Sequence, residues 1–202
     1  MGASIATEAQ NALLDEVELS DQLVLCEDEP TSYADATTDK GSGGKALGEV
    51  AVDSGDFSQA AGDTSGRKTT VAQQADIDVD VSGDLDHVAL VDDGASVLEA
   101  VAMLANSAIT GVDTGTDTIT IDGDHTGDIS AGDRITIRGS TGNDGGYEVD
   151  SVSANGDDTD VTVTGSITDA TVDGTCIYGA QAVTSGNTVT VNAWDIEVQD
   201  PS

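Results

Sequence analysis

The chain has 202 residues and a mass of 20.3 kDa, and 39 Asp and Glu against six Lys and Arg give it a formal net charge of −33. Nucleic acids and anionic membrane surfaces are bound through basic side chains, so this charge excludes both as partners. The longest apolar run, residues 95–105, contains Glu99 and falls well short of the ~20 residues that a membrane-spanning helix needs. Because no secretory signal opens the chain, we expect synthesis in the host cytoplasm.

The acidic residues are spread evenly along the chain rather than gathered in a block. Residues 108–179 carry −0.17 charges per residue and the other 130 residues carry −0.16, and Asp outnumbers Glu by 30 to 9. In molar salt the repulsion between such charges is screened within about 3 Å, while hydrated carboxylates keep the protein soluble. We therefore expect an extremely halophilic source. General acidity in a low-salt organism and calcium binding are the alternatives.

The first predicted element is a helix over residues 7–17. Ala9, Leu13 and Val17 would share its buried face, and Thr7 and Gln10 have the spacing of a capping box. A strand at residues 23–26 follows. Residues 37–67 are rich in Gly, Ser and Asp with weak hydrophobic periodicity, so we predict a long loop or arm there.

Short strands follow from residue 68 onward. Alternation of β-branched and polar residues predicts strands around residues 69–71, 77–81, 88–90, 119–121, 135–137, 161–163 and 189–191. Turn pairs such as Ser82-Gly83 and Asp93-Gly94 separate them. This pattern predicts an all-β protein in which a β-sandwich or jelly-roll-like domain carries one N-terminal helix.

The chain also predicts an insertion. Residues 109–178 form a self-contained run of about five strands, and residues 181–198 form a last hairpin. If this hairpin pairs with strands before residue 108, a small β-barrel or sandwich is inserted into a loop of a host domain. We therefore predict a host domain of residues 1–107 plus 180–202, with the arm at 37–67, and an inserted domain of residues 108–179.

Several stretches carry a resemblance to a known family. In the host they are residues 13–14, 21–26, 29–36, 65–68, 87–92, 181–189, 193–198 and 200–201. These stretches resemble a widespread family of small structural proteins encoded in the head region of tailed-virus genomes. The typical member joins the histidine strand to the last hairpin by a short connection, where this chain inserts about 70 residues. The insert, through residues 129–135 and 139–149, is similar to a small β-module common in virion proteins.

The resemblance implies a non-enzymatic virion structural protein from a virus of an extreme halophile. We expect a capsid decoration or turret subunit on the capsid exterior, bound to the major capsid protein, with the insert projecting. A closed homo-oligomer, a trimer or pentamer, is expected. A tail or neck component is the first alternative, and a halophilic carbohydrate- or cation-binding adhesion module is the second.

Candidate chemistry in the chain is sparse, and we expect no cofactor. The glycine-rich residues 41–46 lack the Ser or Thr that follows the lysine of a phosphate-binding loop. Asp122, Asp124 and Asp128 near His125 form a weak candidate cation site, with a solvated loop as the alternative. No catalytic constellation is expected.

Other notable residues are predicted to be structural. His87 lies in a strand where the resembling family also has a structural residue. Cys26 and Cys176 are expected to be buried, reduced thiols. Trp194, with Ile196, is predicted to anchor the host core.

The arm and the basic pair beside it are the predicted interface. Leu47, Val50, Val52 and Phe57 are the apolar residues of the arm, and we expect them to be ordered against a neighbouring subunit or the shell. Arg67 and Lys68 are adjacent cations in a chain with few, so they are expected to pair with carboxylates within the subunit or across an interface.

Overall fold

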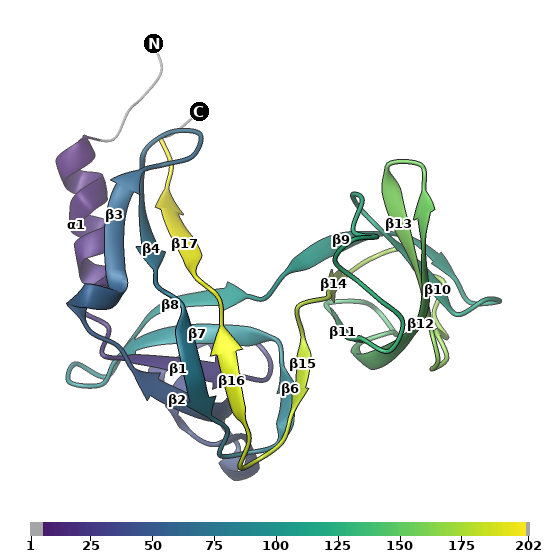
Figure 1. The fold of residues 1–202 in the computed structure, drawn as a ribbon, viewed down its shortest axis with the longest axis horizontal. Helices are drawn as coiled ribbons and strands as arrows, with labels where there is room; N and C mark the ends of the chain where they lie inside the picture. Colours follow the sequence, from purple (N-terminus) through teal and green to yellow (C-terminus); the bar gives the residue numbers. More distant parts are fainter. Residues whose placement is uncertain (1–5, 201–202) are drawn as a thin grey trace. The chain divides into compact units, whose positions relative to one another are not determined.

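Strands account for 47% and helices for 11% of the computed structural model, which describes residues 6–200 (Figure 1). The predicted all-β class with an N-terminal helix is confirmed. A second helix, α2 (Tyr33–Thr37), is a single turn, and Ser32 caps it by accepting a hydrogen bond from the backbone N–H of Asp35.

The described chain divides into two compact units. The first contains the residues up to Gly83, Val88–Ala102 and the residues from Val183 onward, and the second contains Asp84–His87 and Met103–Ala182. The predicted boundaries at 108 and 179 lie inside the second unit. The reason is that the strand through residue 108 begins two residues earlier and is continuous with the second unit's sheet.

A four-stranded sheet with the order β2-β1-β7-β8 runs through the first unit. Its strands are β1 (Gln22–Cys26), β2 (Ala46–Ala51), β7 (His87–Asp92) and β8 (Val97–Met103). Residues 23–26 and 88–91 are all buried, because β1 and β7 are the central strands and are covered on both faces. Their continuous apolar runs follow from this position.

The strands that follow residue 180 pair with strands from the first half of the chain. The pairs and sheets are β17 (Trp194–Val198) with β4 (Arg67–Val71) and β3 (Phe57–Ala61), β16 (Thr188–Val191) with β5 (Gln74–Asp78), and β15 (Gln181–Val183) with β6 (Gly83–Leu85). Trp194 lies opposite Val71, and Val189 lies opposite Ile77. The last hairpin therefore pairs with earlier strands, which is the condition for the predicted insertion.

The helix α1 spans Thr7–Val17, as predicted, but its cap and its buried face differ from the prediction. Its N-cap is Ala6, which has no side-chain acceptor, so the predicted capping box is wrong. Gln10 and Leu14 are buried, whereas Leu13 is 57% exposed. Because Leu13 and Leu14 are adjacent, the helix could bury the face of either one. Gln10 lies on the buried face with Leu14, and its Nε2 donates a hydrogen bond to Asp200 Oδ1 over 3.0 Å.

Residues 37–67 are folded into strands and short turns, and the predicted loop is wrong. They form η1 (Lys40–Ser42), β2, η2 (Ser54–Asp56) and β3. In β2, Gly48 stands where any Cβ would lie 2.1 Å from the carbonyl oxygen of Asp78, so the close approach of β5 requires glycine. Small residues such as alanine and glycine at such positions interrupt the alternation of apolar and polar side chains from which a strand is predicted.

A closed barrel forms the second unit. Its strands, in the order β10-β13-β12-β11-β14-β9, are β9 (Asn106–Asp113), β10 (Thr118–Ile121), β11 (Arg134–Arg138), β12 (Gly145–Asn155), β13 (Asp158–Val163) and β14 (Thr175–Ile177). All six neighbouring pairs are antiparallel. The long strands β9 and β12 each use one half for one neighbour and the other half for the next. Closure leaves this barrel without a free edge.

β-Branched side chains fill the barrel. The enclosed residues are Ile109, Ile119, Ile121, Ile129, Ile135, Ile137, Val149, Val161, Val163, Ile167 and Cys176. The predicted alternation at residues 119–121, 135–137 and 161–163 therefore gives the inward positions correctly. The enclosed cluster contains no aromatic ring, although Tyr147 and Tyr178 pack against its border.

Replacing an enclosed isoleucine should destabilise the protein strongly. Ile121 is fully buried, so Ile121→Ala is expected to lower the free energy of unfolding by about 2–5 kcal/mol through lost burial and a residual cavity. Ser153 on β12 is exposed, and Ser153→Ala should change stability by no more than about 0.5 kcal/mol. Urea unfolding at constant high salt measures both, and equal effects would contradict the assignment of the barrel core.

Candidate functional site

The predicted interface residues of the arm are used inside the chain. Leu47 is fully buried, Val52 and Phe57 are buried, and Val50 is half-buried opposite Leu23 of β1. These side chains pack within their own subunit because the segment forms β2 and β3. They do not present an apolar face to a neighbour, and the predicted interface is corrected on this point.

The two adjacent cations are also satisfied within the chain. Lys68 Nζ lies 2.6 Å from Asp63 Oδ1 and 2.8 Å from Asp195 Oδ2, and these bonds raise the pKa of Lys68. Arg67 Nε donates to Asn11 Oδ1 over 2.8 Å. The predicted pairing with carboxylates within the subunit is therefore found for Lys68, whereas Arg67 bonds to an amide oxygen of the same chain.

The candidate cation cluster is a hydrogen-bonded turn. Asp124 Oδ1 accepts from both the backbone N–H and the hydroxyl of Thr126, which lowers the pKa of Asp124. His125 Nδ1 lies 3.2 Å from Asp128 Oδ2, and His125 Nε2 lies 3.1 Å from the carbonyl oxygen of Asp122. No group of three or more His, Cys, Asp or Glu side chains in residues 6–200 is arranged to hold a metal ion.

The predicted structural residues differ in how deeply they lie. Cys26 in β1 and Cys176 in β14 are fully buried, and burial raises the pKa of the Cys176 thiol to about 12. Trp194 and Ile196 on β17 are half-buried, so they border the first unit's core rather than fill its centre. The indole N–H of Trp194 is buried without a hydrogen-bond partner in the described part of the chain.

A buried ionic cluster surrounds His87 in the second unit. Asp86 is fully buried and His87 is 3% exposed, and His87 Nδ1 lies 2.8 Å from Asp86 Oδ1. The other carboxylate oxygen of Asp86 accepts from Arg138 Nε over 2.9 Å and from Arg138 Nη2 over 2.6 Å. Four residues before Arg138 on β11, Arg134 Nη2 bonds to Asp84 Oδ2 over 2.6 Å.

These bonds keep Asp86 ionised. Burial alone raises the pKa of Asp86, but the hydrogen bonds from His87 and Arg138 more than offset this, and the pKa lies below its usual value. A carboxylate only accepts hydrogen bonds, so Nδ1 of His87 carries a proton. The other ring nitrogen, Nε2, is buried and has no hydrogen-bond partner within residues 6–200. Asp86, His87 and Arg138 therefore act as a structural ion cluster.

One signal in the sequence points to this cluster, although it was not used to predict it. Asp84 and Asp86 are two residues apart, and Arg134 and Arg138 are four apart, so the two arginines occupy one face of β11. In a chain with only six basic residues, two arginines on the same face of a strand indicate that carboxylates lie opposite that face.

The second unit also has open polar hollows. Two of them adjoin the half-buried ring of Tyr178 and are lined by Ala105, Gly127, Asp128, Gly132, Asp133, Arg134, Gly179, Ala180, Gln181 and Ala182. The ring of His125 lies 4.7 Å from that of Tyr178. A third hollow crosses β9, β10, β12 and β13, where hydroxyls pair across strands, as between Thr118 and Thr162 at 2.9 Å.

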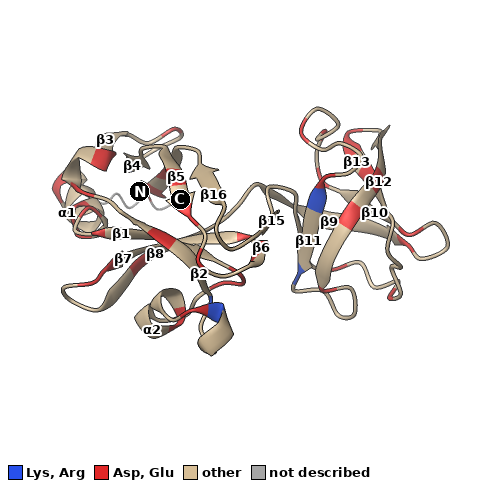
Figure 2. Ribbon diagram, turned by 60° about the horizontal axis from the view of Figure 1, so that its bottom comes forward, with Lys and Arg blue, Asp and Glu red and all other residues tan. Residues whose placement is uncertain are grey.

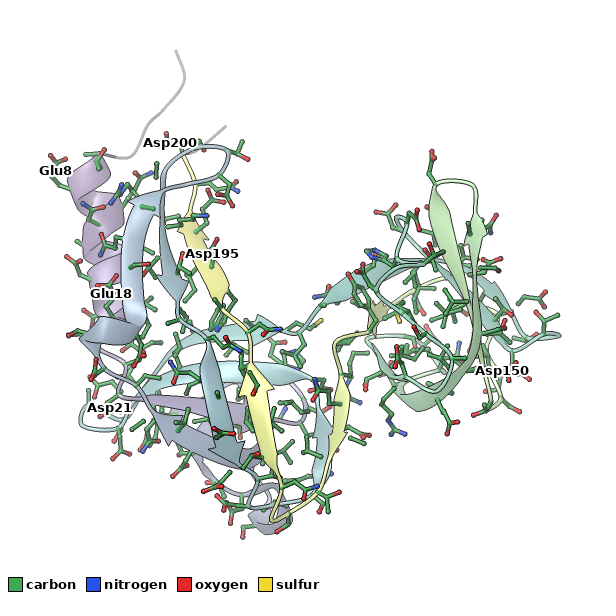
Figure 3. The ribbon with its side chains drawn as sticks, in the orientation of Figure 1. Glu8, Glu18, Asp21, Asp150, Asp195 and Asp200 are labelled. Carbon is green, nitrogen blue, oxygen red and sulfur yellow. The ribbon has the colours of Figure 1, made fainter. Side chains whose placement is uncertain are left out.

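Acidic residues occur on the elements of both units, and basic residues are few (Figure 2). The labelled carboxylates illustrate this: Glu8 and Glu18 belong to α1 and the turn after it, Asp195 to β17, and Asp150 to β12 (Figure 3). In the described part of the chain, no helix is long and apolar enough to cross a membrane.

No model of a protein family, no curated protein and no solved structure matches this chain.

Removing Arg138 should destabilise the protein more than removing a surface cation. Arg138→Met removes two hydrogen bonds to the buried Asp86, and we expect a loss of about 3 kcal/mol, because one member of a buried pair is removed. Lys40→Met, which breaks a surface pair with Glu27, should cost at most about 1 kcal/mol. Equal losses in urea unfolding would contradict a structural role for the cluster.

The same cluster predicts a dependence of stability on pH. The pKa of Asp86 is lower in the folded protein than in the unfolded chain, where it is about 3.9. The contribution of Asp86 to the free energy of unfolding is therefore fully present above the pKa of the unfolded chain, and it is lost as the pH falls through the pKa of the folded protein. In the Arg138→Met variant Asp86 stays buried but loses the arginine, so the pKa of Asp86 in the folded protein is higher than in the parent chain. The loss of stability on acidification should therefore begin at a higher pH. Unfolding midpoints measured from pH 7 to pH 3 check the shift, and identical pH profiles would contradict it.

Proposed function

We propose that this chain is a non-enzymatic structural protein of a halophilic tailed virus, a decoration or turret subunit bound to the major capsid protein on the capsid exterior. The subunit forms a closed homo-oligomer, with three or five copies. The second unit is the module inserted into the family's usual fold.

One observation carries this proposal. The stretches that resemble the virion family come from both ends of the chain, and two of them meet in the first unit, where Glu197 and Val198 of β17 pair with Lys68 and Arg67 of β4. The chain between them builds a barrel with its own enclosed core. An insertion at this point is what the resemblance leads one to expect.

The charge pattern supports the halophilic part of the proposal. Each unit has its own dense set of carboxylates, and such a surface stays soluble and folded where salt screens its repulsion. A local acidic tail would not need a saline environment in the same way.

Stability should therefore rise with salt. We expect the thermal midpoint to increase steadily from 0.1 M toward molar KCl, because the screening length falls from about 10 Å to about 3 Å. Differential scanning calorimetry at fixed pH measures this. A thermal midpoint that stays flat over this range would contradict a halophilic source.

The location is tested on purified particles. Crosslinking mass spectrometry with carboxylate- and lysine-directed reagents should join the first unit to the major capsid protein. Crosslinks from the first unit to tail-tube or baseplate proteins, with none to the shell, would move the assignment to the tail or neck.

A second candidate is carbohydrate binding by the second unit, which the hollows at Tyr178 favour. An aromatic ring beside Asp128, Asp133 and Arg134 offers an apolar surface with polar groups around it, as sugar sites do. Tyr178→Ala would abolish glycan binding without unfolding the first unit if this role holds.

A further inference from the structure

The outer edge of β8 is unpaired. In the order β2-β1-β7-β8, β8 is hydrogen-bonded to β7 on one side, and in the described chain no backbone hydrogen bond joins residues 97–102 to a loop or turn on the other side. The opposite edge of the sheet differs, because the backbone N–H groups of Asp80 and Val81 both donate to Leu47 of β2, at 2.8 and 3.0 Å. An unpaired row of N–H and C=O groups is a template for another strand.

Apolar side chains surround this edge. Residues 97–102 read Val-Leu-Glu-Ala-Val-Ala; Val97 is 41% exposed and the other five are half-buried. On α1, Leu13 is 57% exposed and lies one turn before Glu16 on the same helix face. The carboxylate of Glu16, near the end of α1, is one of the charges that raise the pKa of Glu99.

Glu99 is the one charged residue of β8 and has unfavourable neighbours. Partial burial raises the pKa of Glu99, and the carboxylates of Glu16 and Asp92 raise it further. Among the described residues no Lys, Arg or His pairs with Glu99. A cation placed here from outside would meet two or three carboxylates that the chain leaves uncompensated.

We propose that β8 binds an extended strand of a different protein, which adds to the sheet edge and places a Lys or Arg beside Glu99. Main-chain hydrogen bonds along β8 provide affinity, and the cation provides selectivity. This inference goes beyond the proposed function and does not depend on it, because it concerns the chemistry of the partner strand.

The charge decides against a second copy as the occupant. An antiparallel pair of β8 strands centred on Ala100 would bring the two Glu99 side chains near each other, beside Glu16 and Asp92 of both copies. Like charges across a strand pair are destabilising. Glu99 also repels strands of other acidic chains. The same side chain therefore disfavours a second copy of this protein and favours a basic partner.

The test uses the full chain and three synthetic probes in 1 M KCl, where general attraction to the acidic surface is screened. The first probe is a ten-residue peptide of alternating valine and threonine with one central lysine. The second has a central glutamate instead. The third is the lysine peptide methylated on the backbone nitrogens of one edge, which removes its strand-pairing donors. Amide shifts in two-dimensional NMR spectra locate and quantify binding.

The lysine peptide should shift the amides of residues 97–102, and the methylated and glutamate peptides should bind more weakly. Glu99→Gln should weaken binding of the lysine peptide about two- to fivefold, as expected for an exposed ion pair. Glu99→Lys should reverse the preference, so that the glutamate peptide binds more tightly than the lysine peptide. Glu49→Gln, the same change on the opposite edge strand β2, is the matched control and should leave binding unchanged.

Four results would overturn the proposal. They are no binding at millimolar peptide, equal binding of the lysine and glutamate peptides, full binding of the methylated peptide, and shifts spread over the whole surface. Concentration-dependent shifts of residues 97–102 without any peptide would instead assign the edge to a second copy of the chain.

Discussion

Repulsion among 39 carboxylates is the constraint on which this structure depends, and the six basic side chains show how the chain meets it. Each bonds to a group in another segment. The bonds are Lys40 to Glu27, Lys45 to the carbonyl oxygen of Glu29, Arg67 to Asn11, Lys68 to Asp63 and Asp195, Arg134 to Asp84, and Arg138 to Asp86. The scarce cations hold distant stretches of chain together, and a pair such as Lys68–Asp195 spans 127 positions.

This use of cations has a consequence for the surface. Because every Lys and Arg is engaged by the chain itself, the charges left for a partner are almost all negative. Recognition by this protein therefore rests on backbone edges, apolar side chains and carboxylates. Such a surface selects against acidic competitors.

Sequence patterns predicted those elements whose burial is one-sided. Ile119 and Ile121, or Val161 and Val163, alternate with polar residues because one strand face is enclosed and the other is solvated. The pattern failed in β2, where position 48 is glycine because the backbone of Asp78 lies against it. It also failed on α1, where Leu13 and Leu14 are adjacent and the long-range bond from Gln10 to Asp200 decides which face is buried. Contacts between distant segments are not encoded in local periodicity.

The single cysteine in each unit gives the molecule two internal reporters. Cys26 is enclosed in the first unit and Cys176 in the second, and neither sulfur is reachable by solvent in the native state. A thiol reagent can therefore modify either residue only when its own unit opens. The rates at which the two cysteines become alkylated report two separate opening equilibria in one sample, without any engineered label.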